Sequence, residues 1–371
     1  MSSFRVELKK TIDDSYDVEI GRNLVPNLVQ DIRNGLVGGI KRFAVITDSE
    51  VEKRYAFPIL NRLLEAGYRG DLFVFPAGEK SKVRKTKEII EDAMLEKGYR
   101  RDCCVIAVGG GVVTDLAGFV AGTFGRGVPF LNYSTTVLAA ADASIGGKTA
   151  VDTELATNLI GLIYQPKKVY VDIDTWKTLS KRHLVNGLAE TIKHACLADI
   201  ELFEYLENHM EDVLACKPEA CIYISERNCM VKYDVIMKDE REKNLREILN
   251  LGHTVGRAIE TVSDYRLLHG EALAIGMEAQ IRLGCVCGYL TEEERERVSA
   301  LFEKAGFSVK IPEYIDREEL VKKLYTDKKV RDGKLRFVFQ KGIGDVMTFG
   351  DEVYARMVEE QEIREIIRNM D

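Results

Sequence analysis

The chain has 371 residues, too many for one ordinary hydrophobic core, and this length predicts two domains. Hydrophobic residues make up 46% and charged residues 30% of the sequence, which excludes a disordered or collagen-like chain. The net charge of −7 argues against a nucleic-acid partner, because such proteins usually present a basic face.

Membrane and export signals are not evident in the sequence. No apolar run approaches about 18 residues, so we expect no transmembrane helix and no membrane partner. The first twenty residues lack the apolar centre of a secretory signal. The eight cysteines form no C-x-x-C pair, and most lie in apolar runs such as CCVIAV at 103–108. We therefore expect reduced core cysteines in a cytoplasmic protein.

Strands and helices are predicted to alternate in the first half of the chain. The N-terminus predicts a strand, a turn at residues 13–15 and a second strand. A helical pattern covers about 83–97, and a second helix follows the glycines at 109–111. Buried strands are predicted at 42–47, 72–75, 103–108 and 169–172. This alternation is typical of a parallel sheet with helices on both faces.

The second half is predicted to be mainly helical. A hairpin is predicted at 334–339, after a turn at Asp332 and Gly333. We expect an α/β domain over 1–178 and a helical domain over 179–371, with a cleft between them. Amphipathic patterns of helical period cover about 182–208, 218–238, 245–261, 268–287, 291–305 and 351–369.

Two glycine-containing stretches are candidates for binding anions. Gly109–Gly111 follows a strand and opens a helix, so a phosphate could approach its free N–H groups closely. It is neither G-x-G-x-x-G nor a P-loop, and a simple tight turn is the alternative. The second stretch places Asp142 and Lys148 around a Gly-Gly pair, where a solvated surface turn is the alternative.

The histidines suggest a metal site. His253 and His269 each follow an apolar run and precede a helical pattern. With Glu190, which lies in a small and apolar helical stretch, they form a candidate two-histidine, one-carboxylate zinc set. A structural histidine pair is the alternative. His194, four residues after Glu190, could support that ligand, but a position on the helix surface is expected, and His183 and His209 are expected to be exposed.

Charged residues are concentrated just before His253. If this stretch is one helix, residues spaced by three or four lie on a single face and are candidates for a functional site. The alternative is a charged face that is simply solvated. That face would consist of Glu242, Arg246, Asn250, His253 and Arg257.

Taken together, these motifs resemble those of the 3-dehydroquinate synthases, within the sugar-phosphate cyclases, over nearly the whole chain. The matching motifs are GEK at 78–80, GGGVVTDLAGFVAGTFGRG at 109–127, STT at 134–136, DASIGGKTAVD at 142–152, NLIG at 158–161, QP at 165–166, NGLAETIK at 186–193, DERE at 239–242, LNLGHT at 249–254, LHGEA at 268–272 and DKK at 327–329.

The resemblance implies a Rossmann-like NAD domain, a helical metal- and substrate-binding domain and, by position, the role of individual residues. The implied ligands of zinc, or of cobalt or another divalent ion, are Glu190, His253 and His269. The implied NAD-binding residues are Asp48, Glu79, Lys80, Gly110, Gly111, Asp115, Thr135, Thr136 and Thr178. The implied substrate pocket contains Asp142, Lys148, Asn158, Lys193, Lys232, Glu242, Arg246, Asn250 and Lys328 or Lys329. Arg126 would reach the phosphate site of a neighbouring subunit, since the family is generally dimeric.

The implied reaction converts 3-deoxy-arabino-heptulosonate 7-phosphate to 3-dehydroquinate and phosphate. It would use transient oxidation by NAD, β-elimination, re-reduction and aldol closure. Lys232 and Arg246 would bind the substrate carboxylate, for which a guanidinium fork is well suited. This favours a carboxylated substrate over glucose 6-phosphate or sedoheptulose 7-phosphate.

The chain also departs from the family pattern near the anion pocket. Arg257 stands where a histidine is usual, and an arginine cannot shuttle a proton near neutral pH. Thr157 replaces a lysine, Ser134 replaces a proline, and SKRH at 180–183 replaces P-x-R-E. The alternatives are a cyclase for another phosphorylated ketose or an amino analogue, a metal-dependent polyol dehydrogenase, and an inactive paralogue that binds NAD and metal.

Overall fold

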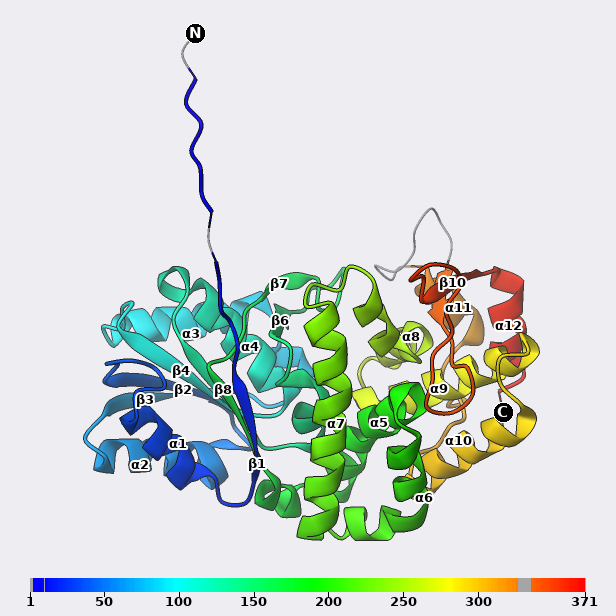
Figure 1. The fold of residues 1–371 in the computed structure, drawn as a ribbon, viewed down its shortest axis with the longest axis horizontal. Coiled ribbons are helices and arrows are strands. Elements are labelled where there is room, and N and C mark those ends of the chain that lie inside the picture. The colour runs from blue at the N-terminus through cyan, green and yellow to red at the C-terminus, as the bar shows by residue number, and fades with distance from the viewer. Residues whose placement is uncertain (1–2, 10, 326–334, 371) are drawn as a thin grey trace.

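A six-stranded parallel sheet forms the first half of the protein. The computed structural model describes residues 3–9, 11–325 and 335–370 (Figure 1). The strand order is β1-β8-β5-β4-β2-β3, and every neighbouring pair is parallel. The strands are β1 (Asp17–Gly21), β2 (Arg42–Asp48), β3 (Arg69–Phe75), β4 (Cys103–Gly109), β5 (Phe130–Ser134) and β8 (Lys168–Asp172). The strands predicted at 42–47, 72–75, 103–108 and 169–172 are confirmed, but the one at 72–75 is only partly buried, since Val74 of β3 is exposed.

Helices cover both faces of this sheet, as the alternating pattern predicted. Alternate residues of a strand point to opposite faces, so Phe43 and Val45 of β2 enter one core cluster while Ala44 and Ile46 enter another. The first cluster includes α1 (Val25–Arg33) and α2 (Phe57–Glu65), and the second includes α3 (Arg84–Glu96) and α4 (Gly111–Thr123). A β-hairpin that the sequence analysis did not predict, β6 (Lys148–Val151) with β7 (Ile160–Ile163), packs against α4.

The second half is mainly helical, which confirms the predicted fold class. Its helices are α5 (Lys181–Ala198), α6 (Ile200–Leu214), α7 (Pro218–Lys238), α8 (His253–Val262), α9 (His269–Val286), α10 (Glu292–Ala305), α11 (Arg317–Leu324) and α12 (Glu360–Arg368). Two short strands, β9 (Leu335–Val338) and β10 (Ala355–Val358), pair in antiparallel fashion. The proposed boundary between residues 178 and 179 stays a prediction.

Several predicted element boundaries were wrong. The helix predicted over 182–208 is divided at Asp199, whose carboxylate accepts a hydrogen bond from Leu202 N (3.0 Å) and so caps α6. The helix predicted over 245–261 is interrupted at Gly252, which has a φ of +73°. The pattern at 351–369 begins with strand β10 rather than a helix. The strand at 335–338 pairs with β10 instead of forming a local hairpin, and the turn predicted at Asp332 and Gly333 lies outside the described residues.

The strand predicted at the very N-terminus is also not seen. Residues 3–9 run away from the body of the protein without strand pairing within the described part of the chain (Figure 1). The turn predicted at 13–15 was wrong: residues 11–16 form no turn, and Ser15 N makes only a local hydrogen bond to Asp13 Oδ1 (3.0 Å). The second predicted strand is β1.

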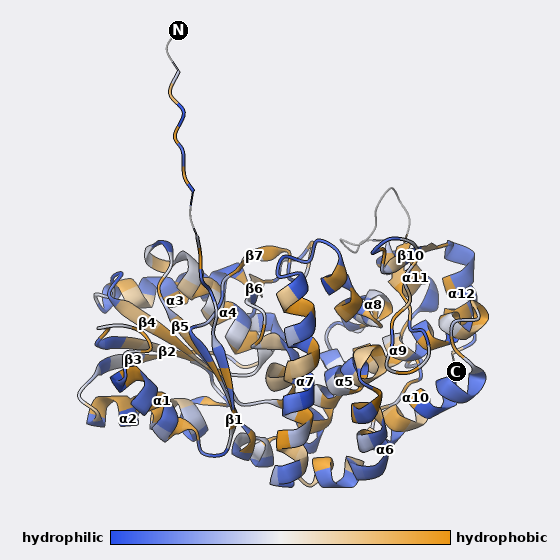
Figure 2. Ribbon diagram, in the orientation of Figure 1, coloured by the Kyte–Doolittle hydropathy of each residue, from blue (hydrophilic) through white to orange (hydrophobic). Residues whose placement is uncertain are grey.

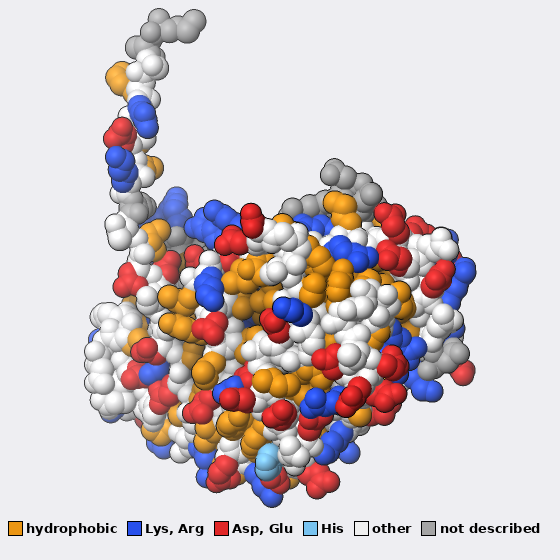
Figure 3. All heavy atoms as spheres, turned by 45° about the vertical axis from the view of Figure 1, so that its right-hand side comes forward, with side chains coloured by type: hydrophobic (Ala, Val, Ile, Leu, Met, Phe, Trp, Pro, Cys, Tyr) orange, Lys and Arg blue, Asp and Glu red, His pale blue; other side chains and the backbone are white. Residues whose placement is uncertain are grey.

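The two halves share one hydrophobic cluster. Val169 and Val171 of β8 pack in the same cluster as Leu188 of α5 and Ile224 of α7. Figure 2 shows apolar residues along the strands of the sheet and polar residues on the outer faces of the helices. Acidic and basic side chains are interspersed over the face seen in Figure 3. Within the described residues, no helix is both long enough and apolar enough to cross a membrane.

Candidate active site

Three side chains from three helices of the helical half converge on one point. Glu190 lies in the middle of α5, while His253 and His269 are the first residues of α8 and α9. Glu190 Oε1 is 3.3 Å from His253 Nε2 and 3.0 Å from His269 Nε2. One ligand atom from each residue lies within 4.8 Å of the other two. The structure therefore brings together the three residues that the sequence analysis grouped.

The remaining ring nitrogens are held by the protein. His253 Nδ1 is 3.1 Å from Leu251 O, and His269 Nδ1 is 3.3 Å from Glu260 Oε2. Hydrogen bonds of this kind fix the imidazole orientation and leave Nε2 to a metal ion. Two imidazole nitrogens and one carboxylate are also the donor set of a catalytic zinc site with an open position. The residues present thus fit a divalent metal.

Electrostatics keep the carboxylate of this cluster ionised. Burial opposes ionisation of Glu190, but the nearby Lys193 and His253 hold its pKa well below the usual range. Burial lowers the pKa of His253 to about 3. Burial also acts to lower the pKa of His269, but hydrogen bonds to Glu190 and Glu260 outweigh it and raise the pKa to about 10. The cluster therefore presents an anionic oxygen to any cation that enters.

Glycines allow the three helices to approach closely enough for this cluster to form. A Cβ on Gly270 would lie 2.0 Å from Asn186 O of α5, and one on Gly276 would lie 2.2 Å from Gly252 O. A side chain at either position would push α9 away from α5 or from the start of α8. The glycines that follow His269 in LHGEALAIG are thus part of the site's construction.

Beside the cluster, two buried cations hold a loop of the sheet domain. Lys232 Nζ donates to Asp142 O (2.5 Å) and Ile145 O (2.8 Å), and it pairs with Asp142 Oδ1 (2.9 Å). Since an ammonium group has three N–H bonds, these contacts occupy it fully. Burial opposes ionisation of Asp142, but the Lys232 ammonium keeps the pKa of this carboxyl below its usual range.

Arg246 is held in a similar way but retains one open donor. Its Nη2 donates to Gly146 O (2.9 Å) and its Nη1 to Glu240 O. The side chain is 1% exposed, and its Nε has no hydrogen-bond partner among the described residues. A buried N–H without a partner is costly, so this group indicates an acceptor that a ligand would supply.

Further predicted pocket residues contact one another at the mouth of this loop. Lys148 Nζ pairs with Glu242 Oε2 (2.5 Å), and Asn250 Nδ2 donates to Glu242 Oε1 (2.9 Å). The expectation that Glu242, Arg246, Asn250, His253 and Arg257 line one continuous helix face was wrong, because the chain breaks at Leu251–Gly252 before α8 begins. The break turns His253 toward Glu190.

Most of the predicted NAD-binding residues lie at the carboxyl ends of the strands. Asp48 ends β2, and Gly110 and Gly111 open α4 after β4. Thr135 and Thr136 follow β5, and Thr178 Oγ1 lies 2.6 Å from Tyr55 Oη. Thr135 is buried and its Oγ1 has no partner among the described residues. In an open parallel sheet this edge is where nucleotides bind, and a helix start with two glycines fits a pyrophosphate.

Sequence reasoning missed Lys82, which lies at the centre of a buried acidic cluster. Its Nζ is 2.6 Å from Asp115 Oδ2 and 3.5 Å from Glu79 Oε1, and it donates to Asn158 Oδ1 (2.6 Å). Burial acts to lower the pKa of Lys82, but Asp115 and Glu79 raise it overall. The available signal was its spacing of three residues from Glu79. Lys80, by contrast, is exposed and its Nζ is 3.8 Å from Asp264, so its role stays a prediction.

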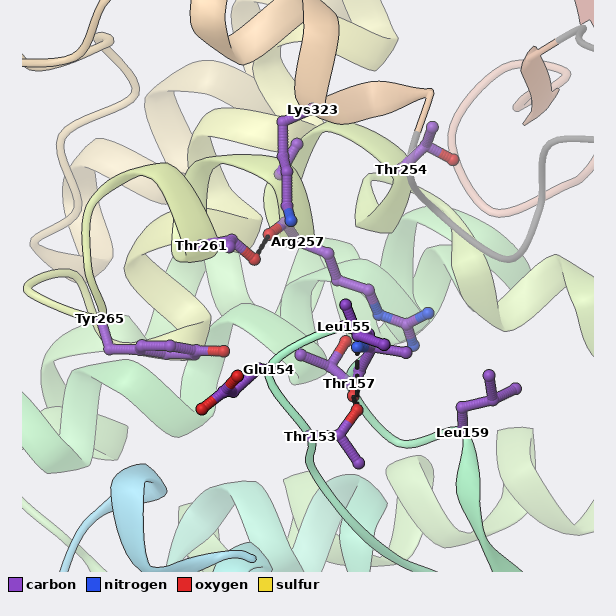
Figure 4. A pocket seen from close by; sticks show the side chains of 12 residues that line it. Thr153, Glu154, Leu155, Thr157, Leu159, Thr254, Arg257, Thr261, Tyr265 and Lys323 are labelled. Atoms are coloured by element: carbon purple, nitrogen blue, oxygen red, sulfur yellow. Dashed lines mark hydrogen bonds between the residues drawn. The ribbon is translucent and has the colours of Figure 1, made fainter.

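A pocket between the β6–β7 loop and α8 contains Arg257 (Figure 4). The guanidinium points toward Leu155, Thr157 and Leu159 of that loop, and no described residue forms an ion pair with it. Lys323 of α11 enters from the opposite side. Two of the residues that depart from the family pattern, Thr157 and Arg257, therefore line the same pocket.

Other candidate residues lie apart from this site or outside the described residues. Arg126 is exposed on the loop after α4 and has a φ of +69°, a conformation that non-glycine residues rarely adopt. Lys328 and Lys329 lie outside the described residues. Their assigned roles, and the reach of Arg126 to a neighbouring subunit, stay predictions.

The remaining histidines were predicted with mixed success. His183 and His209 are exposed, as expected. His194 was expected on a helix surface, and this was wrong: it is 0% exposed, with Nδ1 3.0 Å from Asn228 Oδ1. The face of α5 that carries Glu190 also carries His194 one turn later, and that face is covered by α7. The eight cysteines are free, and those within strand β4 are buried.

Comparison with known proteins places these features in a family. Residues 72–186 match the family described as 3-dehydroquinate synthase N-terminal, and residues 187–330 match 3-dehydroquinate synthase C-terminal. A 3-dehydroquinate synthase of Caldanaerobacter subterraneus is 43% identical over 303 residues, covering 81% of this chain and 85% of the relative. One of Pelobacter propionicus is 42% identical over 335 residues, covering 90% of this chain and 92% of the relative.

A solved structure shares the whole fold. The 2-epi-5-epi-valiolone synthase of Streptomyces hygroscopicus, with NAD+ and Zn2+ bound, superposes with a TM-score of 0.87. It is 29% identical to this chain, and the alignment covers 99% of both chains.

Proposed function

The chain belongs to the 3-dehydroquinate synthase family, and from this premise we propose the reaction that it catalyses. It is a sugar-phosphate cyclase that converts 3-deoxy-arabino-heptulosonate 7-phosphate to 3-dehydroquinate and inorganic phosphate. We propose further that the protein acts in the cytoplasm as a homodimer. Its substrate is a small phosphorylated sugar acid.

One observation carries the choice of a carboxylated substrate. Arg246 is 1% exposed, and its Nε has no partner among the described residues, while the rest of its guanidinium is held by backbone carbonyls. A fixed, buried guanidinium N–H is suited to a carboxylate oxygen. Sugar phosphates without a carboxylate would leave this donor unsatisfied, which disfavours them as substrates.

The cofactors of the proposed reaction are NAD and zinc, with cobalt or another divalent ion as the alternative metal. Glu190, His253 and His269 would hold the metal, and the carboxyl ends of β2, β4 and β5 would hold the dinucleotide. When bound, NAD supplies a reversible hydride acceptor, and the metal supplies a Lewis acid for adjacent hydroxyls.

The chain's own residues would position the substrate and its protons. Lys193, 1% exposed and paired with Glu190, places an ammonium beside the metal ligands, where a developing alkoxide needs positive charge. Glu242, held by Lys148 and Asn250, offers a fixed acceptor for a substrate hydroxyl. Arg257 would bind the phosphate that leaves, and the buried α5–α9 contacts exclude water from the intermediate.

A second candidate follows from the pocket that contains both Thr157 and Arg257. A cyclase for another phosphorylated ketose or an amino analogue would use the same cofactors with a changed anion pocket. The test variant is Arg257→His. A large gain in rate with the heptulosonate phosphate would mark Arg257 as a loss of activity rather than as a change of substrate, and a loss of rate would support the leading proposal.

The proposal is tested by following phosphate release and NADH absorbance together. The purified protein is supplied with NAD, zinc and the heptulosonate phosphate, and in separate reactions with sedoheptulose 7-phosphate and glucose 6-phosphate. We expect phosphate release without net NADH from the first substrate alone. Net NADH without phosphate would indicate a polyol dehydrogenase instead, and no phosphate from the first substrate would overturn the proposal.

A further inference from the structure

Tyr16 lies at the end of an apolar row that ties β1 to the helical half. Tyr16, Val18 and Ile20 alternate along the chain and pack against the cluster that α5 and α7 help to form. The ring is partly buried, and burial raises the pKa of its hydroxyl. The hydroxyl is therefore neutral at neutral pH.

The hydroxyl contacts the loop between Asp142 and Lys148. Gly146 N donates a hydrogen bond to Tyr16 Oη (2.8 Å). The C=O of the same peptide unit, Ile145 O, accepts from Lys232 Nζ (2.8 Å). Tyr16 and Lys232 thus hold the two ends of one peptide plane.

The next carbonyl along the chain holds Arg246. Gly146 O accepts a hydrogen bond from Arg246 Nη2 (2.9 Å). Tyr16 therefore contacts the N–H of Gly146, and Arg246 contacts the C=O of the same residue. Gly146 has a φ of +90°, and a Cβ there would lie 2.5 Å from Arg246 Nη2. The orientation of Gly146 therefore sets the position of the guanidinium.

We propose that Tyr16 is a positioning residue for Arg246, and that its hydroxyl tunes the enzyme's affinity for the substrate carboxylate. Without the hydroxyl, the Ile145–Gly146 peptide would lose one of its two hydrogen-bonded restraints. Gly146 O, which holds Arg246 Nη2, would then turn together with that peptide. Arg246 Nε would then spend less time in the orientation that meets a ligand. This inference rests on the proposed function, because it assumes that Arg246 contacts the substrate.

The experiment compares Tyr16→Phe with Tyr99→Phe. Tyr99 Oη likewise contacts the backbone, but it donates its proton to Phe43 O (2.8 Å), near the amino end of the sheet. For Tyr16→Phe we expect KM to rise about tenfold, the worth of one hydrogen bond, with kcat within about twofold of the parent. Tyr99→Phe should lower the thermal midpoint and leave KM unchanged.

Arg246→Lys completes the test, alone and combined with Tyr16→Phe. Lysine keeps the charge but lacks the planar fork, so KM should rise in the single variant. If Tyr16 acts through Arg246, adding Tyr16→Phe to Arg246→Lys should change KM by less than about twofold. A full tenfold effect in both backgrounds, or a Tyr16→Phe enzyme with normal KM, would overturn the role of Tyr16 alone. An Arg246→Lys enzyme with normal KM would instead overturn the proposed contact between Arg246 and the substrate.

Discussion

Glu190 and Lys193, one turn apart in α5, form an ion pair in which each side chain is 1% exposed. A buried charge left without any partner typically costs about 3–5 kcal/mol, but after removal of Lys193 the Glu190 carboxylate still contacts His253 and His269. We therefore expect Lys193→Met to lower the free energy of unfolding of the metal-free protein by up to about 3 kcal/mol, the lower end of that range, measured by urea denaturation. Arg62→Met is the control, because its pair with Glu65 is exposed and should contribute less than about 1 kcal/mol. Equal losses of unfolding free energy in the two variants would contradict the burial of the Glu190–Lys193 pair.

The proposed metal ligands predict a specific loss of zinc. His253→Ala removes one of three ligands, so zinc bound after dialysis should fall far below one ion per chain and turnover should be lost. His209→Ala is the matched control, since His209 is exposed and contacts Asp212 and the ring of Tyr205 rather than the metal cluster. A His253→Ala protein that keeps stoichiometric zinc and full turnover would refute the ligand set.

Arg257 should contribute to phosphate affinity. Its guanidinium enters the pocket formed with Thr157 and forms no ion pair within the described residues, so a bound phosphate would meet it without competition. We expect Arg257→Gln to raise the inhibition constant of inorganic phosphate about 10- to 100-fold, the usual range for a charge-assisted hydrogen bond. Arg33→Gln, on the exposed end of α1, should have no effect. Unchanged phosphate inhibition in Arg257→Gln would exclude this role.

Gly146→Ala should weaken substrate binding as well as the fold. The added Cβ would lie 2.5 Å from Arg246 Nη2 and 2.7 Å from Ile236 Cδ1, in addition to the strain of an alanine at a φ of +90°. Gly67→Ala isolates the strain, because Gly67 has a φ of +85° and no atom lies within 4 Å of its added Cβ. Strain should cost each variant about 1–2 kcal/mol of stability, and the contacts of the added Cβ should make the loss larger in Gly146→Ala. Only Gly146→Ala should raise KM, by about tenfold or more. A similar KM in both variants would show that Arg246 tolerates the displacement.

The buried His194 predicts that stability falls in mild acid. Burial lowers the pKa of His194 to about 4, below the 6.5 of a free imidazole. Between pH 6.5 and 4 the unfolded state binds a proton that the folded state does not, so stability falls as the pH falls. At about 1.4 kcal/mol per pH unit, the wild type should lose about 3 kcal/mol over this window relative to His194→Gln.

Urea unfolding at both pH values, with metal removed, measures this difference. Both proteins retain the other titratable groups, so only the contribution of residue 194 differs between them. If the wild type and His194→Gln lose the same free energy of unfolding between pH 6.5 and 4, His194 is protonated in the folded state as well.

The sequence alone was sufficient to predict five of the six strands of the sheet, all but β5, and the Glu190, His253 and His269 cluster, for identifiable reasons. Apolar β-branched runs such as that of β4 need no distant partner to be recognised, and two scarce histidines at helix starts draw attention to Glu190. The break at Gly252 was missed because the apolar period continues through it. The reason for the break is visible only in the fold. Helix α9 approaches so closely that a side chain at position 252 would clash with Met277.

Other misses have a tertiary origin. Lys80 and Lys82 have equivalent sequence surroundings, and only the fold shows which one enters the acidic cluster with Asp115. Likewise, nothing in the stretch around His194 reveals that α7 covers that face of α5. Burial of a polar residue depends on a partner that is distant in sequence, and local pattern does not encode it.

The hydrophobic cluster shared by β8, α5 and α7 has a consequence for how the protein unfolds. Neither half buries its apolar surface completely without the other, because Val169 and Val171 of the sheet pack with Leu188 and Ile224 of the helices. The free energy of this contact is lost only when both halves separate, which couples their melting into one cooperative transition. The sheet domain expressed on its own would expose this face to water and be prone to aggregation.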